Sequence, residues 1–115
     1  MSGSNLLQET LRHLIAEGKT QADIEWCGND EGWFSWEEFM ELASKTNYNN
    51  GYGGAEIIES LKVVGKDFWL ERHEYDGSEW WEFKSLPQRP VERKKPFRLA
   101  REGYSNENLF QETVE

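Results

Sequence analysis

The sequence predicts an α+β domain in which two N-terminal helices pack on one face of a three- to four-stranded antiparallel β-meander. Two observations predict this fold. Two amphipathic segments precede residue 46, and three apolar β-type runs joined by tight turns end at Ser85. The length of 115 residues suits one domain, and six Trp, six Phe and four Tyr supply the apolar area for one modest core.

The first helix is predicted over residues 6–17. Leu7, Leu11 and Leu14 recur at helical spacing and therefore share one face. Asn5 stands where an N-cap side chain can accept from the first orphan amides, and Gln8 occupies the capping-box position. A short strand is expected over residues 24–27, followed by a turn at residues 28–30.

The second helix is predicted to begin at Ser35. Ser35 and Glu38 have the capping-box spacing, in which each side chain serves a backbone N–H of the other residue. The helix should end near Lys45. The residues expected to be buried on it are Trp36, Phe39, Met40 and Ala43.

The three strands are predicted around two hairpin turns, Gly65-Lys66 and Asp76-Gly77. The first turn sets Val63 opposite Phe68, and the second sets Leu70 opposite Phe83. Both turns then place the apolar residues on the same sheet face, and a slip by one residue would scatter them. That face is expected to carry Leu61, Val63, Phe68, Leu70, Trp81 and Phe83.

The opposite sheet face is the predicted partner-binding site. It is aromatic, polar and charged at once, and a solvated face has no need of two Trp and a Tyr. Trp and Tyr also dominate the hot spots of protein interfaces. Homodimerisation through this face and cover by the C-terminal residues are the alternatives. The predicted site residues are Trp69, Glu71, His73, Tyr75, Trp80 and Glu82.

The charge is unevenly spread along the chain. The formal net charge is −9, which repels nucleic acid and anionic membranes. Residues 1–86 are predicted to form the globular domain, and residues 87–115 a Pro-containing basic arm followed by an acidic tail. The basic arm contains one acidic residue, Glu92. Its six cations are Arg89, Arg93, Lys94, Lys95, Arg98 and Arg101.

No catalytic residues and no cofactor are predicted. Cys27 lies in a short apolar run, where an unpaired Cys is usually a small hydrophobe. Two alternative functions remain open. One is a single-stranded nucleic-acid binder that uses the six cations of the basic arm. The other is a small metal-dependent hydrolase built on Glu71, His73 and Glu82.

The residues from Val64 to Pro87, VGKDFWLERHEYDGSEWWEFKSLP, resemble small uncharacterised proteins of phages and mobile elements of Gram-positive bacteria. The loop from Thr46 to Gly54 and the opening of the first helix are similar to them as well. That group has no assigned activity, so the resemblance implies no catalytic residues. It implies a genomic setting in which small acidic proteins inhibit host defence systems, including CRISPR effectors.

The predicted function is therefore that of a non-enzymatic phage or mobile-element accessory protein. It binds a host protein through an acidic, aromatic surface, in the manner of an anti-CRISPR inhibitor of a defence nuclease. Direct contact with nucleic acid or a membrane is not expected, and a homodimer is an open alternative. A single Cys and a polar start with no apolar run after it predict the cytoplasm of a bacterial host.

Overall fold

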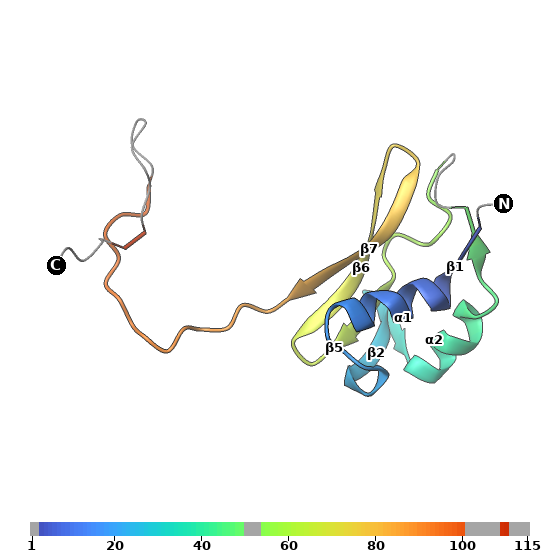
Figure 1. Ribbon diagram of the computed structural model, residues 1–115, viewed down its shortest axis with the longest axis horizontal. Helices are drawn as coiled ribbons and strands as arrows, with labels where there is room; N and C mark the ends of the chain where they lie inside the picture. The colour runs from blue at the N-terminus through green and yellow to red at the C-terminus, as the bar shows by residue number, and fades with distance from the viewer. Residues whose placement is uncertain (1–2, 50–53, 101–108, 111–115) are drawn as a thin grey trace.

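The computed structural model describes residues 3–49, 54–100 and 109–110. Within these residues the chain is α+β (Figure 1). Helix α1 spans Leu6–Ala16 and helix α2 spans Trp36–Ala43, with a 3-10 turn at Gln21–Asp23. The strands are β1 Ser4–Asn5, β2 Ile24–Asn29, β3 Gly32–Phe34, β4 Asn47–Tyr48, β5 Lys62–Gly65, β6 Phe68–Tyr75 and β7 Ser78–Ser85.

The predicted architecture is wrong, because the seven strands are divided between two sheets and do not form one meander after two N-terminal helices. Strands β2 and β3 lie between α1 and α2 in the chain, and they extend the meander into a five-stranded antiparallel sheet of order β3-β2-β5-β6-β7. Strands β1 and β4 form a second, two-stranded sheet. The turn expected at residues 28–30 lies one residue later, where Asn29 Oδ1 accepts from the Glu31 N–H at 2.8 Å. Residues 32–34 are thereby free to return as a strand.

The core lies between the helices and one face of the five-stranded sheet, which we call the inner face. Helix α1 contributes Leu6 and Leu14 to it. The Trp81 indole N–H donates to Thr10 Oγ1 at 2.8 Å and ties β7 to α1. The remaining buried apolar residues come from both sheets, from α2 and from the segment before β5: Cys27, Trp36, Phe39, Ala43, Tyr48, Ile57, Val63, Phe68, Leu70 and Trp81.

The second predicted hairpin is confirmed. Asp76 and Gly77 both have positive φ, 54° and 85°, as a two-residue turn of type I′ requires. Leu70 pairs with Phe83 as expected. The predicted register of the first hairpin is wrong. Val63 pairs with Leu70 rather than Phe68, because the turn lies one residue later than predicted. This moves the pairing by two residues, so each side chain keeps its predicted face.

Both predicted N-caps are confirmed, and the capping box is confirmed at Ser35. Asn5 Oδ1 accepts from the Gln8 N–H at 3.1 Å. Ser35 Oγ accepts from the Glu38 N–H at 3.1 Å, while Glu38 Oε1 accepts from the Ser35 N–H at 3.0 Å. The sequence therefore marks both helix starts locally. At α1 long-range bonds add to the cap, because Asn5 Nδ2 also donates to Ser44 O and the Leu6 N–H donates to Thr46 O.

A buried ionic cluster, not anticipated from the sequence, joins α1, β4, β6 and β7 on the inner face. Arg72 forms ion pairs with Glu9 at 3.3 Å and with Glu79 at 2.8 Å. Tyr48 donates its hydroxyl to Glu9, and burial with this bond raises the pKa of Tyr48 to about 12. Burial alone would lower the pKa of Arg72, but bonds to Tyr48 and Glu79 raise it. The guanidinium therefore stays charged inside the domain.

Glu79 also fixes the segment that leads into β5. Its carboxylate accepts from the backbone N–H groups of Glu56 at 2.6 Å and Ile57 at 3.1 Å. Bonds to an ionised acceptor are stronger than neutral ones. This segment is therefore held against the sheet although it contains no helix or strand.

Beyond β7 the chain extends away from the sheet (Figure 1), and residues 87–100 form no helix or strand. The division into a domain over residues 1–86 and an arm with a tail stays a prediction. No helix in the described ranges has the length and apolarity needed to cross a membrane.

Candidate binding surface on the sheet

The outer face is the face of the five-stranded sheet opposite the core. Successive side chains of a strand point to opposite faces, so the outward residues of β6 share it with those of β7. Cross-strand pairing sets Glu71 opposite Glu82 and His73 opposite Trp80. The structure thus brings all six predicted site residues together: Trp69, Glu71, His73, Tyr75, Trp80 and Glu82.

Hydrogen bonds fix Trp69 and His73 of the outer face through one carboxylate. The Trp69 indole N–H donates to Glu71 Oε1 at 2.7 Å. His73 Nε2 lies 2.7 Å from Glu71 Oε2. The bond from Trp69, and next that from His73, holds the pKa of Glu71 below its ordinary value of 4.5. Glu71 is therefore ionised at neutral pH and orients an aromatic side chain on each side.

Glu82 has a matching set of partners on β6 and β7. The Trp80 indole N–H donates to Glu82 Oε2 at 3.4 Å. Glu82 Oε1 lies 3.4 Å from Lys84 Nζ and 3.5 Å from His73 Nε2. His73 therefore lies close to both carboxylates of a cross-strand pair that would otherwise repel each other. Tyr75 differs from these residues, since it is 75% exposed near the hairpin tip.

Two further tryptophans, Trp26 and Trp33, which were not among the predicted site residues, complete this face. Trp26 pairs with Val64, which in turn pairs with Trp69, so a row of apolar side chains crosses three strands. Trp33 pairs with Gly28 on the edge strand β3 and is 71% exposed. The period-2 alternation along residues 24–27 could have indicated Trp26. The pairing of β2 with β5 could not be read from any local turn.

The outer face holds the carboxylates of Glu71 and Glu82 in contact with donors, although their side chains are still 25% and 38% exposed. Each glutamate has an indole N–H and His73 within reach, and Lys62 pairs with Glu71 across the β5–β6 ladder. The half-buried Trp side chains are its main apolar groups. Such a face suits contact with apolar or cationic groups.

Two sets of residues were considered for catalysis: Cys27 as a nucleophile, and Glu71, His73 and Glu82 as metal ligands. Burial raises the pKa of the Cys27 thiol to about 12, so the thiol is protonated at neutral pH, and thiols react as thiolates. Among the described residues, no group of three or more His, Cys, Asp and Glu side chains is arranged to hold a metal ion. This includes Glu71, His73 and Glu82.

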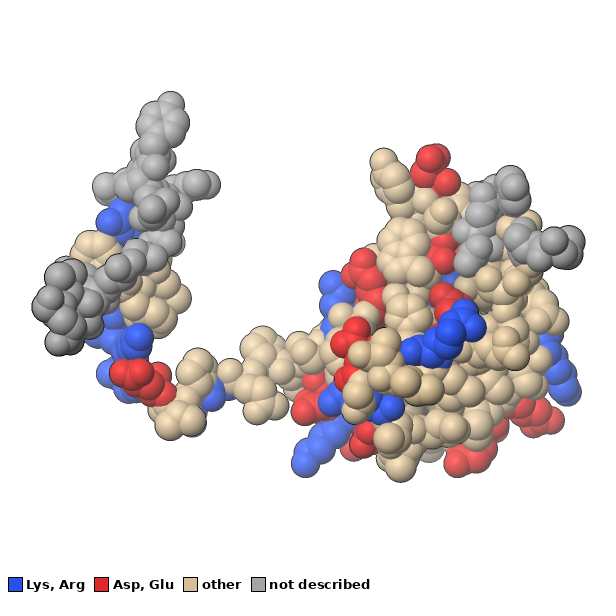
Figure 2. All heavy atoms as spheres, in the orientation of Figure 1, with Lys and Arg blue, Asp and Glu red and all other residues tan. Residues whose placement is uncertain are grey.

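The predicted nucleic-acid residues lie on the arm, away from the outer face. Arg89, Arg93, Lys94 and Lys95 are exposed, and Arg98 lies with its guanidinium 4.7 Å from the Phe97 ring centroid. Figure 2 shows the Lys and Arg side chains of the arm apart from the domain, whose surface mixes both signs of charge. Arg101 and most of the acidic tail lie outside the described residues. Nucleic-acid binding by this arm stays a prediction.

Comparison with protein-family models, with curated proteins and with solved structures finds no match to this chain. The resemblance to phage and mobile-element proteins therefore stays a prediction, and functional inference rests on the site itself.

Proposed function

We propose that this protein is a non-enzymatic binding protein that recognises a partner protein through the outer face. One observation carries the proposal. Three tryptophans, Trp26, Trp69 and Trp80, lie half-buried on one sheet face, and Trp69 and Trp80 donate their N–H groups to glutamates of their own strands. Rings held in place before binding lose little side-chain entropy on association.

The charge of the chain favours a protein partner over nucleic acid. Trp rings can stack on bases, but Glu71 and Glu82 lie beside these rings and repel phosphates. The net charge of −9 adds a longer-range repulsion of the same sign. An acidic binder with an aromatic surface instead complements a partner that presents Arg and Lys.

The acidic charge of the chain also indicates a class of partner. A groove that handles nucleic acid is strongly positive because it binds phosphates, and an acidic protein can occupy it in place of the nucleic acid. We therefore propose a nucleic-acid-handling host protein, such as a defence nuclease, as the partner and its inhibition as the outcome. The charge and the aromatic face support this class, and the genomic setting implied by the resemblance agrees with it.

The test is affinity capture from a bacterial host lysate, followed by reconstitution with the purified captured protein. The variant is Trp69→Ala/Trp80→Ala. The matched control is Ile15→Ala, which removes an exposed apolar side chain of α1. A partner that binds wild type and Ile15→Ala but not the double variant supports the proposal.

Circular dichroism and the unfolding midpoint must show that the double variant is folded. If the double variant unfolds, the experiment is repeated with Trp69→His, because His keeps a ring and a donor N–H. A reconstituted partner that binds a folded outer-face variant as tightly as wild type contradicts the proposal.

A further inference from the structure

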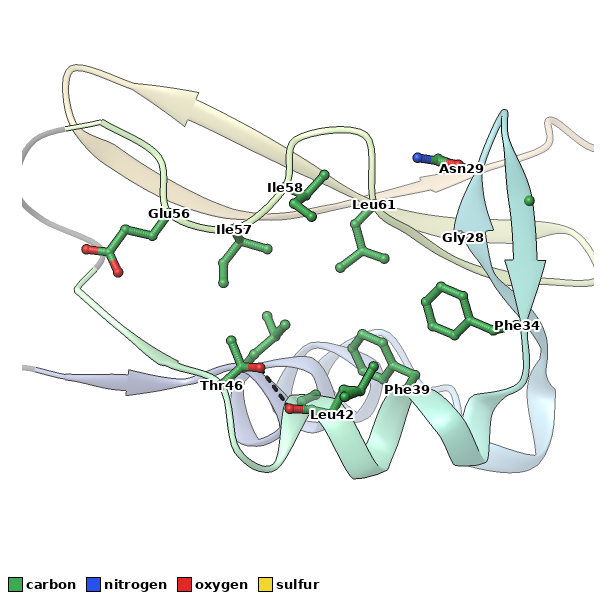
Figure 3. Close-up of a pocket in the computed structure, with 13 residues that line it drawn as sticks. Gly28, Asn29, Phe34, Phe39, Leu42, Thr46, Glu56, Ile57, Ile58 and Leu61 are labelled. Atoms are coloured by element: carbon green, nitrogen blue, oxygen red, sulfur yellow. Dashed lines mark hydrogen bonds between the residues drawn. The ribbon is translucent and has the colours of Figure 1, made fainter.

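An apolar pocket of about 410 Å³ lies between α2 and the segment before β5 (Figure 3). Ile57 and Leu61 point into it from that segment, Phe39 and Leu42 face them from α2, and Phe34 of β3 closes one end. The volume falls within the range of pockets that hold ligands, roughly 300–1,000 Å³. None of these residues belongs to the outer-face site.

The mouth of the pocket has exposed apolar side chains and one lining glutamate, Glu56, with two more glutamates next to these residues in the chain. Leu42 is 65% exposed and Ile58 is 71% exposed. Glu56 lines the pocket, and Glu41 and Glu59 adjoin Leu42 and Ile58 in the chain. Within the described ranges, none of these three glutamates forms an ion pair. The mouth therefore suits an apolar group flanked by cations.

A second hollow, of about 600 Å³, lies on the other side of the β2–β3 hairpin. Trp26 and Trp33 line it together with the acidic residues Glu25, Asp30 and Glu31. A cation over a Trp ring beside carboxylates is stabilised by both. The hollow and the apolar pocket share Asn29 and Gly32, so the edge strand β3 separates an apolar site from one suited to a cation.

In the sequence of the basic arm, two apolar residues alternate with a cation, which matches an apolar pocket on one side of β3 and a cation site on the other. In the structure the segment bends at Phe97 and Leu99, and Arg98 lies over the Phe97 ring. If the segment becomes extended on docking, Phe97 and Leu99 point to one side and Arg98 to the other. The segment Phe97–Leu99 has three residues, the same length as β3, so it can pair with the whole of that strand. Pro96 is compatible with the start of an edge strand. Leu99 is 86% exposed and Phe97 remains half-exposed beside Leu109. The six cations of the arm complement the carboxylates around β3.

We infer that the arm segment Phe97–Leu99 docks along the β3 edge of a second copy of this chain. Phe97 and Leu99 enter the apolar pocket, and Arg98 lies in the Trp26/Trp33 hollow. Addition of an extended segment to an exposed sheet edge is a common mode of recognition. The arm extends away from its own domain (Figure 1), and no described ion pair joins the two. Reciprocal exchange of two arms closes a dimer.

Sedimentation velocity of the full-length chain tests this inference. Wild type is expected to dimerise at concentrations up to about 200 μM, where a complex with a micromolar Kd is populated. Phe97→Ser/Leu99→Ser and Ile58→Asp are expected to be monomers, because each removes one side of the contact. Ile58 is exposed, so its substitution spares the core.

Matched controls separate docking from general effects. Val91→Ser changes an exposed apolar residue of the arm outside the docking segment, and Arg89→Glu makes the charge change of Arg98→Glu elsewhere on the arm. Arg98→Glu should weaken dimerisation at least about tenfold, since it places a carboxylate among carboxylates. Val91→Ser should dimerise as wild type does, and Arg89→Glu should weaken dimerisation less than Arg98→Glu does.

A mixing experiment identifies the contact. Phe97→Ser/Leu99→Ser keeps an intact pocket and Ile58→Asp keeps an intact arm, so their mixture retains one of the two contacts. It should associate more weakly than wild type but more strongly than either variant alone. A monomeric wild type, including one whose arm docks on its own domain, overturns the inference. So does a dimer that these variants leave unchanged. Neither result bears on Trp69 and Trp80.

Discussion

Arg72 of β6 donates to Glu79 of β7 across their hairpin, with 2.8 Å between Nη2 and Oε1, and the two side chains are 1% and 2% exposed. Glu79 in turn binds the backbone of residues 56 and 57, which form part of the apolar pocket. A single buried charge pair therefore connects the sheet to the wall of a candidate binding site.

Replacement of Arg72 tests how much the buried ionic cluster contributes to the stability of the fold. Arg72→Met should lower the free energy of unfolding by about 3–5 kcal/mol, because it leaves Glu9 and Glu79 buried without a counter-charge. Lys84→Met, which removes an exposed partner of Glu82, should cost no more than about 1 kcal/mol. Urea denaturation measures both. A loss below about 1 kcal/mol for Arg72→Met would mean that the cluster is not a stabilising element.

The tryptophans of the two sheet faces should differ in their effect on stability. Trp81 is 1% exposed and bonded to Thr10, so Trp81→Ala should cost about 3–5 kcal/mol. Trp69 is half-buried on the outer face, and Trp69→Ala should cost about 1 kcal/mol. Thermal and urea unfolding of the two variants provide the comparison. Equal losses would assign Trp69 to the core rather than to a binding surface.

The thiol of Cys27 should be protected in the native state. It is fully buried, and its pKa is raised to about 12. A thiol-specific disulfide reagent should therefore modify Cys27 only after unfolding, at a rate that rises with urea. The chain carries one Cys, so the signal has a single source. Rapid modification of the folded chain at neutral pH would show that the β2 position is open to solvent.

The carboxylate of Glu71 should make stability depend on pH in the acidic range. Its folded-state pKa is lowered below 4.5, chiefly by the Trp69 indole N–H. Its contribution is therefore complete above the pKa of the unfolded chain, and it is lost as pH falls through the lower folded-state value. Glu71→Gln should lose less unfolding free energy than wild type between about pH 5 and pH 2. Parallel acid dependences would contradict the assigned bonds.

The sequence specifies the parts of the fold that depend on neighbouring residues. Asn5, Ser35 and Glu38 cap helices through contacts over three positions, and Asp76-Gly77 sets its hairpin through two backbone conformations. Period-2 alternation then assigns each residue of β6 and β7 to a face. The outer-face residues were predicted for this reason, despite the shifted first turn.

Long-range pairing is what the sequence does not reveal. The contact of β2 with β5 joins residues on either side of α2, and no turn residue marks it. Trp26 and Trp33 were missed as a result. Alternation along β6 places Arg72 on the inner face, but its partner Glu9 lies on α1 and only tertiary packing brings the two together.

The most direct test of the account is a calorimetric titration of the purified partner with wild-type chain and with Trp69→Ala/Trp80→Ala. The folded double variant is expected to bind at least about 30-fold more weakly, because truncated hot-spot tryptophans cost this much affinity. Equal affinity of the two proteins would contradict the claim that the outer face is the binding surface.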